Sequence, residues 1–181
     1  MKDCPVYIDG SNVAYSRNND NEKPTLDDIT LQLKHLIANL AFDRKNIHCI
    51  CDPGLKYHID KPIEYEALVK EGVIIEAPKV ADEFILSFAL KHDFCFIISN
   101  DKFREYTDQL PSQQWLEDRR ISFMFVSEEV CLSPNIDYKA IESVPFKKED
   151  PKKIKKNIKK EITTLDVLDK IKETSGEFDL F

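Results

Sequence analysis

The sequence lacks any long uninterrupted apolar run, and this absence excludes one large class of proteins. No stretch of the 181 residues approaches the length that a helix needs to cross a lipid bilayer. The chain reaches a strand-like segment within a few residues of its start, so we expect no signal peptide. With 42% hydrophobic and 33% charged residues, the composition is typical of a soluble globular protein. We therefore expect a cytoplasmic protein.

The chain also has no cysteine pattern that supports a disulfide framework. Its five cysteines are an odd number, are irregularly spaced and lie mostly inside apolar segments. Cys49 and Cys51 alternate along one segment, but no second cysteine pair exists to complete a zinc site. We expect reduced, mostly buried thiols.

Positive charge is scarce in most of the chain, although the formal net charge is only -7. Of the 26 basic and 33 acidic residues, ten and eight lie in residues 147–181, so residues 1–146 hold 16 and 25 and carry a net charge of -9. An acidic body argues against broad, nonspecific binding of nucleic acid. It is compatible with a small carboxylate pocket that attracts cations first.

Length and composition predict one domain followed by a tail. We assign the domain to residues 1–146 and the tail to residues 147–181. The tail opens with a lysine-rich segment, which we interpret as a linker or a basic arm. Beyond it, Leu165, Leu168 and Ile171 recur at helical spacing and predict a short helix.

Strand-like apolar segments alternate with segments of helical period in the domain. The predicted strands cover residues 6–9, 47–51, 73–77, 94–99 and 121–126, and the predicted helices cover residues 26–40, 64–71, 82–90 and 111–120. Thr25 and Asp28 supply the capping signal of the first helix. This order predicts an α/β protein of three layers (α/β/α), with a central, mostly parallel five-stranded sheet of the Rossmann-like kind. Such sheets bind ligands beyond the carboxyl ends of their strands.

Polar side chains gather where the predicted strands end. The tetrapeptide Asp9-Gly10-Ser11-Asn12 follows the first strand, and Gly10 allows a sharp turn or a close approach to a ligand. Asp82 opens a predicted helix, while Asp101 follows the fourth strand with Glu105 on the same face four residues later. We expect these groups to meet at one edge of the sheet.

Carboxylates that converge repel one another and raise each other's pKa unless a cation neutralises them. Magnesium and manganese both prefer oxygen ligands, and magnesium binds through one or two carboxylates, several waters and a substrate phosphate. A metal held in this way activates water and polarises a phosphate group. The acidic edge therefore favours phosphodiester chemistry with Mg²⁺ or Mn²⁺.

Structural roles compete with this interpretation. Asp82 taken alone is equally well explained as a helix N-cap. Asp52, which precedes Pro-Gly, is best explained as a turn residue, and Asn100 with Asp101 is also compatible with a turn. A phosphatase that uses Asp9 as nucleophile is disfavoured, because the haloacid-dehalogenase pattern requires an aspartate where this chain has Ser11.

Basic and aromatic side chains give weaker signals. Lys79 and Arg104 flank the acidic edge and are the leading candidates for phosphate contacts, ahead of Arg119 and Arg120. We assign Trp115 to packing between helix and sheet in preference to base stacking.

Four segments together resemble the NYN branch of the PIN-domain ribonucleases, and especially the Regnase-type nuclease domain. The segments are residues 6–14 (VYIDGSNVA), 82–85 (DEFI), 98–105 (ISNDKFRE) and Trp115 with 119–123 (RRISF). The resemblance covers about residues 4 to 135 in order. It implies a PIN-like fold and a Mg²⁺- or Mn²⁺-dependent endoribonuclease whose substrate is single-stranded or stem-loop RNA.

The resemblance also implies roles for individual residues. Asp9, Asp82 and Asp101 would bind the metal, Asn12 would orient Asp9 or the substrate, and Glu105 would complete the catalytic set. The residues expected to bind substrate are Ser11, Lys79, Asn100 and Arg104.

Two positions depart from the Regnase-type pattern. Ala81 stands where that pattern has a further aspartate, and Glu105 stands where it has aspartate. The zinc finger that accompanies many relatives is absent from this sequence. The alternative hypothesis is therefore a catalytically weak or inactive RNA-binding or scaffold module of the same fold.

Two interpretations remain open for the tail. Its lysine-rich segment is either a tether for RNA phosphates or a solubilising linker. Its acidic-aromatic end, residues 178–181, is a candidate for docking on a protein partner or on a second copy of the chain as a homodimer.

Overall fold

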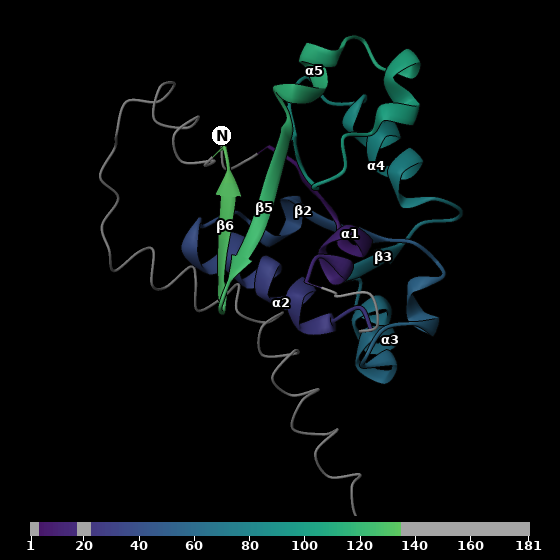
Figure 1. The fold of residues 1–181 in the computed structure, drawn as a ribbon, viewed down its shortest axis with the longest axis vertical. Helices are drawn as coiled ribbons and strands as arrows, with labels where there is room; N and C mark the ends of the chain where they lie inside the picture. The colour runs from purple at the N-terminus through teal and green to yellow at the C-terminus, as the bar shows by residue number, and fades with distance from the viewer. Residues whose placement is uncertain (1–3, 18–22, 135–181) are drawn as a thin grey trace, which may run out of the picture.

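Six strands form one sheet in the order β3-β2-β1-β4-β5-β6 (Figure 1). The structure is a computed structural model and describes residues 4–17 and 23–134. The strands are β1 (Val6–Asp9), β2 (Ile47–Cys51), β3 (Ile74–Glu76), β4 (Phe96–Ile98), β5 (Arg120–Val126) and β6 (Glu129–Ser133). The predictions made for the tail, residues 147–181, lie outside the described residues.

The five predicted strands are confirmed as a parallel set, and a sixth was missed. β6 pairs antiparallel with β5, and the two run side by side in Figure 1. The turn between them is only two residues long, and Ser127 adopts a left-handed conformation with φ of 57°. Glycine or asparagine normally marks such a turn, so the sequence contained no hairpin signal here.

Helices cover both faces of the sheet, which confirms the three-layer arrangement. Val6 and Ile8 of β1 pack in a core with α1 (Gly10–Tyr15), α2 (Leu26–Lys34) and α3 (Pro62–Lys70). Tyr7 points to the opposite face, as the two-residue period of a strand requires, and packs in a second core with α4 (Ala81–Ala89) and α5 (Gln113–Glu117). No helix in the described parts of the chain is both long and apolar enough to cross a membrane.

Short π- and 3₁₀-helical turns replace parts of the predicted helices and loops. They are η1 (His35–Asn39), η2 (Arg44–Asn46), η3 (Leu55–Tyr57) and η4 (Arg104–Gln109). The helix predicted over residues 26–40 therefore ends as an α-helix at Lys34 and continues as the π-helical turn η1.

The capping signal predicted for α2 works differently from expectation. The Thr25 hydroxyl donates to Asp28 Oδ2 at 3.1 Å and does not cap the helix backbone. Instead, Leu26 N–H donates to Oδ1 of Asp60 at 2.8 Å. A residue distant in sequence thus satisfies the first orphan donor of the helix.

The tetrapeptide after β1 forms the first turn of a helix. Asp9 is the N-cap of α1, and its Oδ1 accepts the N–H of Asn12 at 3.0 Å. Gly10 allows a close approach, but to β2 and not to a ligand: an added Cβ would collide with Cys51 Sγ and lie 2.8 Å from Cys49 Sγ. Because Gly10 has no side chain, α1 can pack directly against β2.

Candidate functional site

The strand order places a topological switch point between β1 and β4. From β1 the chain continues to β2 on one side, whereas β4 continues to β5 on the other. Both strands are parallel, so their carboxyl ends lie side by side, with Ile8 paired to Ile98. The connections leave this point in opposite directions, and sheets of this kind bind ligands in the crevice that results.

Asp9 lies at the end of the central strand and is only 4% exposed. Its Oδ2 accepts the Ser99 hydroxyl at 2.8 Å, while Oδ1 accepts the backbone of Asn12. Burial raises the pKa of Asp9 to about 7, and the charges of Asp82 and Asp52 act in the same direction, against the lowering effect of its two hydrogen bonds. The structure thus holds a carboxyl group that ionises near neutral pH.

The loop after β4 is fixed by its own hydrogen bonds. Ser99 Oγ accepts the N–H of Asp101 at 3.0 Å, and Asp101 Oδ1 accepts the N–H of Phe103 at 2.8 Å. Phe103 adopts a left-handed conformation with φ of 48°, and its side chain is buried. That conformation costs a non-glycine residue roughly 1–2 kcal/mol. Burial of the aromatic ring and the Asp101 hydrogen bond offset this strain and hold the loop.

Asp82 lies in the first turn of α4 but is not its cap. The N–H of Ala81 donates to Asp52 Oδ1 at 2.8 Å, so Asp52 from the end of β2 fills the capping role. Burial, together with the charges of Asp101, Asp52 and Glu105, raises the pKa of Asp82 to about 6. The carboxylate of Asp82 is therefore free of the structural role that competed with a functional one.

Asp52 was interpreted as a turn residue and adds a carboxylate to this edge. Ala81, where the resemblance leaves an aspartate missing, is 1% exposed and packs in the α4 core. The Asp52 carboxylate accepts the backbone N–H of Ala81, and its charge raises the pKa of both Asp9 and Asp82. No sequence signal at Asp52 itself pointed to this, because the contact spans 29 residues.

Several predicted site residues have hydrogen bonds within the protein. Ser11 is buried and its hydroxyl accepts the N–H of Asp52 at 2.8 Å. The side chain of Asn12 accepts the N–H of Asn100 at 2.9 Å. The Asn100 amide exchanges two hydrogen bonds of 3.0 Å with the backbone of Phe123. Ser11 thus ties α1 to the end of β2, while Asn12 and Asn100 tie α1, the loop after β4 and β5 together.

Five predicted residues line one open pocket of about 620 Å³: Asp82, Asn100, Asp101, Arg104 and Glu105. Arg104 is exposed there and supplies a cationic side chain beside the carboxylates. Lys79 is also exposed but lines a neighbouring groove instead.

Arg119, Arg120 and Trp115 have structural contacts. Arg119 is 8% exposed, donates to the carbonyl oxygens of Asp93 and Trp115, and lies 4.4 Å from the centroid of the Trp115 ring. Arg120 donates to the carbonyl of Ser99 at 3.2 Å.

The oxygen-rich edge suits a hard cation that keeps several of its waters better than a cation that needs a full set of protein ligands. Within residues 4–17 and 23–134, no group of three or more His, Cys, Asp or Glu side chains is arranged to hold a metal ion. Magnesium retains several waters and needs only one or two carboxylates from the protein. The coupled carboxyl groups of Asp9 and Asp82 meet that lower requirement in donor chemistry and in charge.

Comparisons with known proteins identify a family and a fold for this chain. A family model described as "Zc3h12a-like Ribonuclease NYN domain" matches residues 2–142. Two structures of the nuclear protein-only RNase P 2 (PRORP2) of Arabidopsis thaliana are similar, with TM-scores of 0.55 and 0.56 and sequence identities of 19% and 20%. Each match covers 72% of this chain but 29% of PRORP2, and at this identity the likeness concerns the fold. No curated protein matches the chain.

Proposed function

Since this chain belongs to the family of Zc3h12a-like ribonuclease NYN domains, we propose that it is an endoribonuclease that hydrolyses RNA phosphodiester bonds with Mg²⁺ or Mn²⁺. The observation that carries the proposal is the position of Asp9. It is a buried carboxyl group at the switch point of the sheet, electrostatically coupled to Asp82 and Asp52. A divalent cation offsets the cost of ionising such a group.

Asp9 and Asp82 would hold the ion together with Asp101, which lines the open pocket beside Asp82. When bound, the ion supplies an activated water and polarises the scissile phosphate. Ser99 and the backbone of Asn12 keep both Asp9 oxygens oriented. This support matters because a metal ligand that is held by further hydrogen bonds loses less freedom on binding.

The exposed side chains of the pocket would act on the RNA. Arg104 would contact a phosphate oxygen, which offsets the negative charge of the substrate. Glu105 would accept a proton or orient water at the pocket mouth. The acidic body offers no broad basic surface for a duplex backbone, so we propose single-stranded or looped RNA as the substrate.

A cleavage assay with the purified full chain tests the proposal. Wild type, Asp9→Asn and Asp101→Asn are compared on a labelled stem-loop RNA with Mg²⁺, Mn²⁺ or EDTA. Asp108→Asn, an exposed change in η4 outside the pocket lining, is the matched control. We expect cleavage by wild type and Asp108→Asn only with metal, and activity that survives both site substitutions would reject the proposed site.

Two observations favour a second candidate, an RNA-binding module without catalysis. The described residues contain no ready three-ligand metal site, and Ala81 is buried where the resemblance has a further aspartate. Calorimetry separates the candidates. Divalent-ion binding that disappears in Asp9→Asn supports the nuclease, whereas RNA binding without any ion binding at millimolar concentration supports the module.

A further inference from the structure

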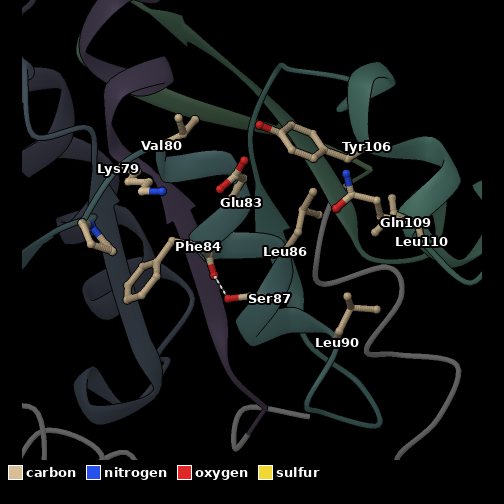
Figure 2. A pocket seen from close by; sticks show the side chains of 11 residues that line it. Lys79, Val80, Glu83, Phe84, Leu86, Ser87, Leu90, Tyr106, Gln109 and Leu110 are labelled. Atoms are coloured by element: carbon tan, nitrogen blue, oxygen red, sulfur yellow. Dashed lines mark hydrogen bonds between the residues drawn. The ribbon is translucent and has the colours of Figure 1, made fainter.

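A groove between α4 and η4 lies next to the acidic pocket and has no role in the proposed hydrolysis. We call it the α4 groove; its volume is about 530 Å³, and its walls include Glu83, Phe84, Leu90, Tyr106, Gln109 and Leu110 (Figure 2). Leu90 is 44% exposed. Apolar side chains that remain exposed around a concave site are typical of a binding surface.

Tyr106 connects the groove to the acidic pocket, because its side chain lines both. In Figure 2 its hydroxyl end lies toward Glu83. Burial, followed by the charges of Asp82 and Glu83, raises the pKa of the Tyr106 hydroxyl, which agrees with this proximity. A nucleotide whose phosphate lies over the pocket beside Asp82 would therefore have its base at the mouth of the α4 groove.

The walls of the groove suit a planar heterocycle. Tyr106 supplies an aromatic face on which a base can stack, whereas the Phe84 ring lies on the other side of Ser87 (Figure 2). The Glu83 carboxylate can accept a hydrogen bond from the polar edge of a base, and the Gln109 amide can both donate and accept one. Lys79 lines the same groove and is exposed, so it can offset the charge of an adjoining phosphate.

The size of the groove favours a small group over a protein surface. Its volume lies within the range of about 300–1,000 Å³ that is usual for small-molecule sites. A stable protein interface buries about 800 Å² on each partner. The volume of the groove therefore suits a small ligand such as one nucleoside unit.

We infer that the α4 groove binds the nucleobase adjacent to the scissile phosphate and so gives the enzyme a base preference. This inference rests on the proposed function, because the phosphate over the acidic pocket fixes which nucleotide reaches the groove. Stacking supplies most of the affinity, and Glu83 with Gln109 distinguishes among bases.

Base binding is tested on the full chain with Ca²⁺ in place of Mg²⁺ or Mn²⁺, because Ca²⁺ takes the same oxygen ligands and keeps a cation between the acidic pocket and the phosphate. The probe is a short single-stranded RNA with 2-aminopurine at each position in turn, whose fluorescence falls when the base stacks. Ser87→Phe places a ring in the groove from an exposed position on α4, and Ser87→Ala is the matched control that leaves the groove open. We expect quenching with wild type and Ser87→Ala, and loss of quenching with about a tenfold higher Kd for Ser87→Phe.

A second variant covers the case in which Ser87→Phe does not fold. Tyr106→Leu keeps the apolar volume but removes the aromatic face, and should also reduce the quenching. Unchanged quenching and Kd in folded Ser87→Phe would overturn the inference. So would a change confined to self-association in analytical ultracentrifugation, because the groove would then be a protein contact.

Cleavage assays on RNAs that differ only in the nucleotide beside the cut distinguish failure of the inference from failure of the proposed function. If RNA is cut but Ser87→Phe retains its affinity and base preference, the groove is not the base site and the hydrolysis stands. If 2-aminopurine is quenched by wild type and not by Ser87→Phe, yet no RNA is cut with Mg²⁺ or Mn²⁺, the groove assignment stands and the hydrolysis fails.

Discussion

Two acidic clusters in the described part of this protein differ in whether cationic side chains pair with their carboxylates. The first, which we call the α2 cluster, consists of Asp27, Asp28 and Asp60 near the start of α2. Lys61 pairs with Asp27 at 2.8 Å, Arg17 pairs with Asp28 at 3.0 Å, and Asp60 accepts the N–H of Leu26. The fold supplies its own cations and donors there.

The second cluster lies at the carboxyl edge of the sheet, where the described residues supply hydrogen-bond donors but no ion-paired cation. In the described parts of the chain, no lysine or arginine forms an ion pair with its members: Asp9, Asp52, Asp82, Asp101 and Glu105. Both clusters contain a carboxyl group whose pKa burial raises, Asp28 in one and Asp9 in the other. Only at the α2 cluster does an arginine act to lower it again. Charge that the fold leaves uncompensated is typical of a site that awaits a ligand.

The largest expected difference between the clusters is in metal binding and cleavage. Asp82→Asn should weaken metal affinity and cleavage by at least about 100-fold, because losing even an outer-shell partner of a metal site costs about 10–100-fold. Asp28→Asn, the matched change in the α2 cluster, should retain both within a few-fold. Titration calorimetry with Mn²⁺ and a cleavage assay below the unfolding temperature measure the two effects. Equal losses in both variants would remove the distinction between the clusters.

Stability should depend on pH through the carboxyl edge. The folded-state pKa of Asp9 is about 7 and that of Asp82 about 6, both above the ordinary value of 3.8. At a pH between 3.8 and the raised pKa values, the folded state binds more protons than the unfolded state. The free energy of unfolding therefore decreases as pH rises from about 5 to 8. We expect a loss on the order of 2–3 kcal/mol in EDTA, measured by urea denaturation.

Two controls identify the source of this slope. Asp9→Asn should flatten it and should be more stable than wild type at pH 8 in EDTA. Mg²⁺ or Mn²⁺ should restore stability to wild type at pH 8, because binding to the folded state alone stabilises it. A slope of the same size in Asp9→Asn would show that the buried carboxyl group is not its cause.

The position of the carboxyl edge could be predicted from sequence, since apolar periodicity located the strands and parallel strands bring their ends together. Asp9, Asp82 and Asp101 were found in this way. Ser99 and Asp52 were not, because their roles depend on contacts with residues 90 and 29 positions away. Register between distant strands fixes such contacts, and no local pattern encodes it. Ser11 and Asn100 were expected to bind substrate, but their hydroxyl and amide groups bond to the protein backbone.

Removing a cation from the α2 cluster should affect folding and not catalysis. Arg17→Met leaves Asp28, which is 5% exposed, without its ion pair. The free energy of unfolding should fall by about 1–2 kcal/mol at pH 7, below the 3–5 kcal/mol of fully buried pairs because the Arg17 side chain is 38% exposed. Arg17→Lys keeps the charge and should lose less. Thermal denaturation with a parallel cleavage assay tests this, and a change in the catalytic rate of folded Arg17→Met would contradict it.

The smallest effect should come from the exposed ion pair of the α2 cluster. Lys61 and Asp27 are 36% and 56% exposed, and exposed pairs contribute roughly 0–1 kcal/mol that salt screens further. Lys61→Ala should therefore lower the free energy of unfolding by less than about 1 kcal/mol at low salt, and by less again at 1 M salt. Lys45→Ala removes a cation whose pair with Asp43 also lies at the surface and serves as the matched control. A loss well above 1 kcal/mol for Lys61→Ala alone would mean that Lys61 also stabilises Asp28 and Asp60 nearby. The α2 cluster would then be one coupled network, and its contrast with the carboxyl edge would be sharper than separate pairs imply.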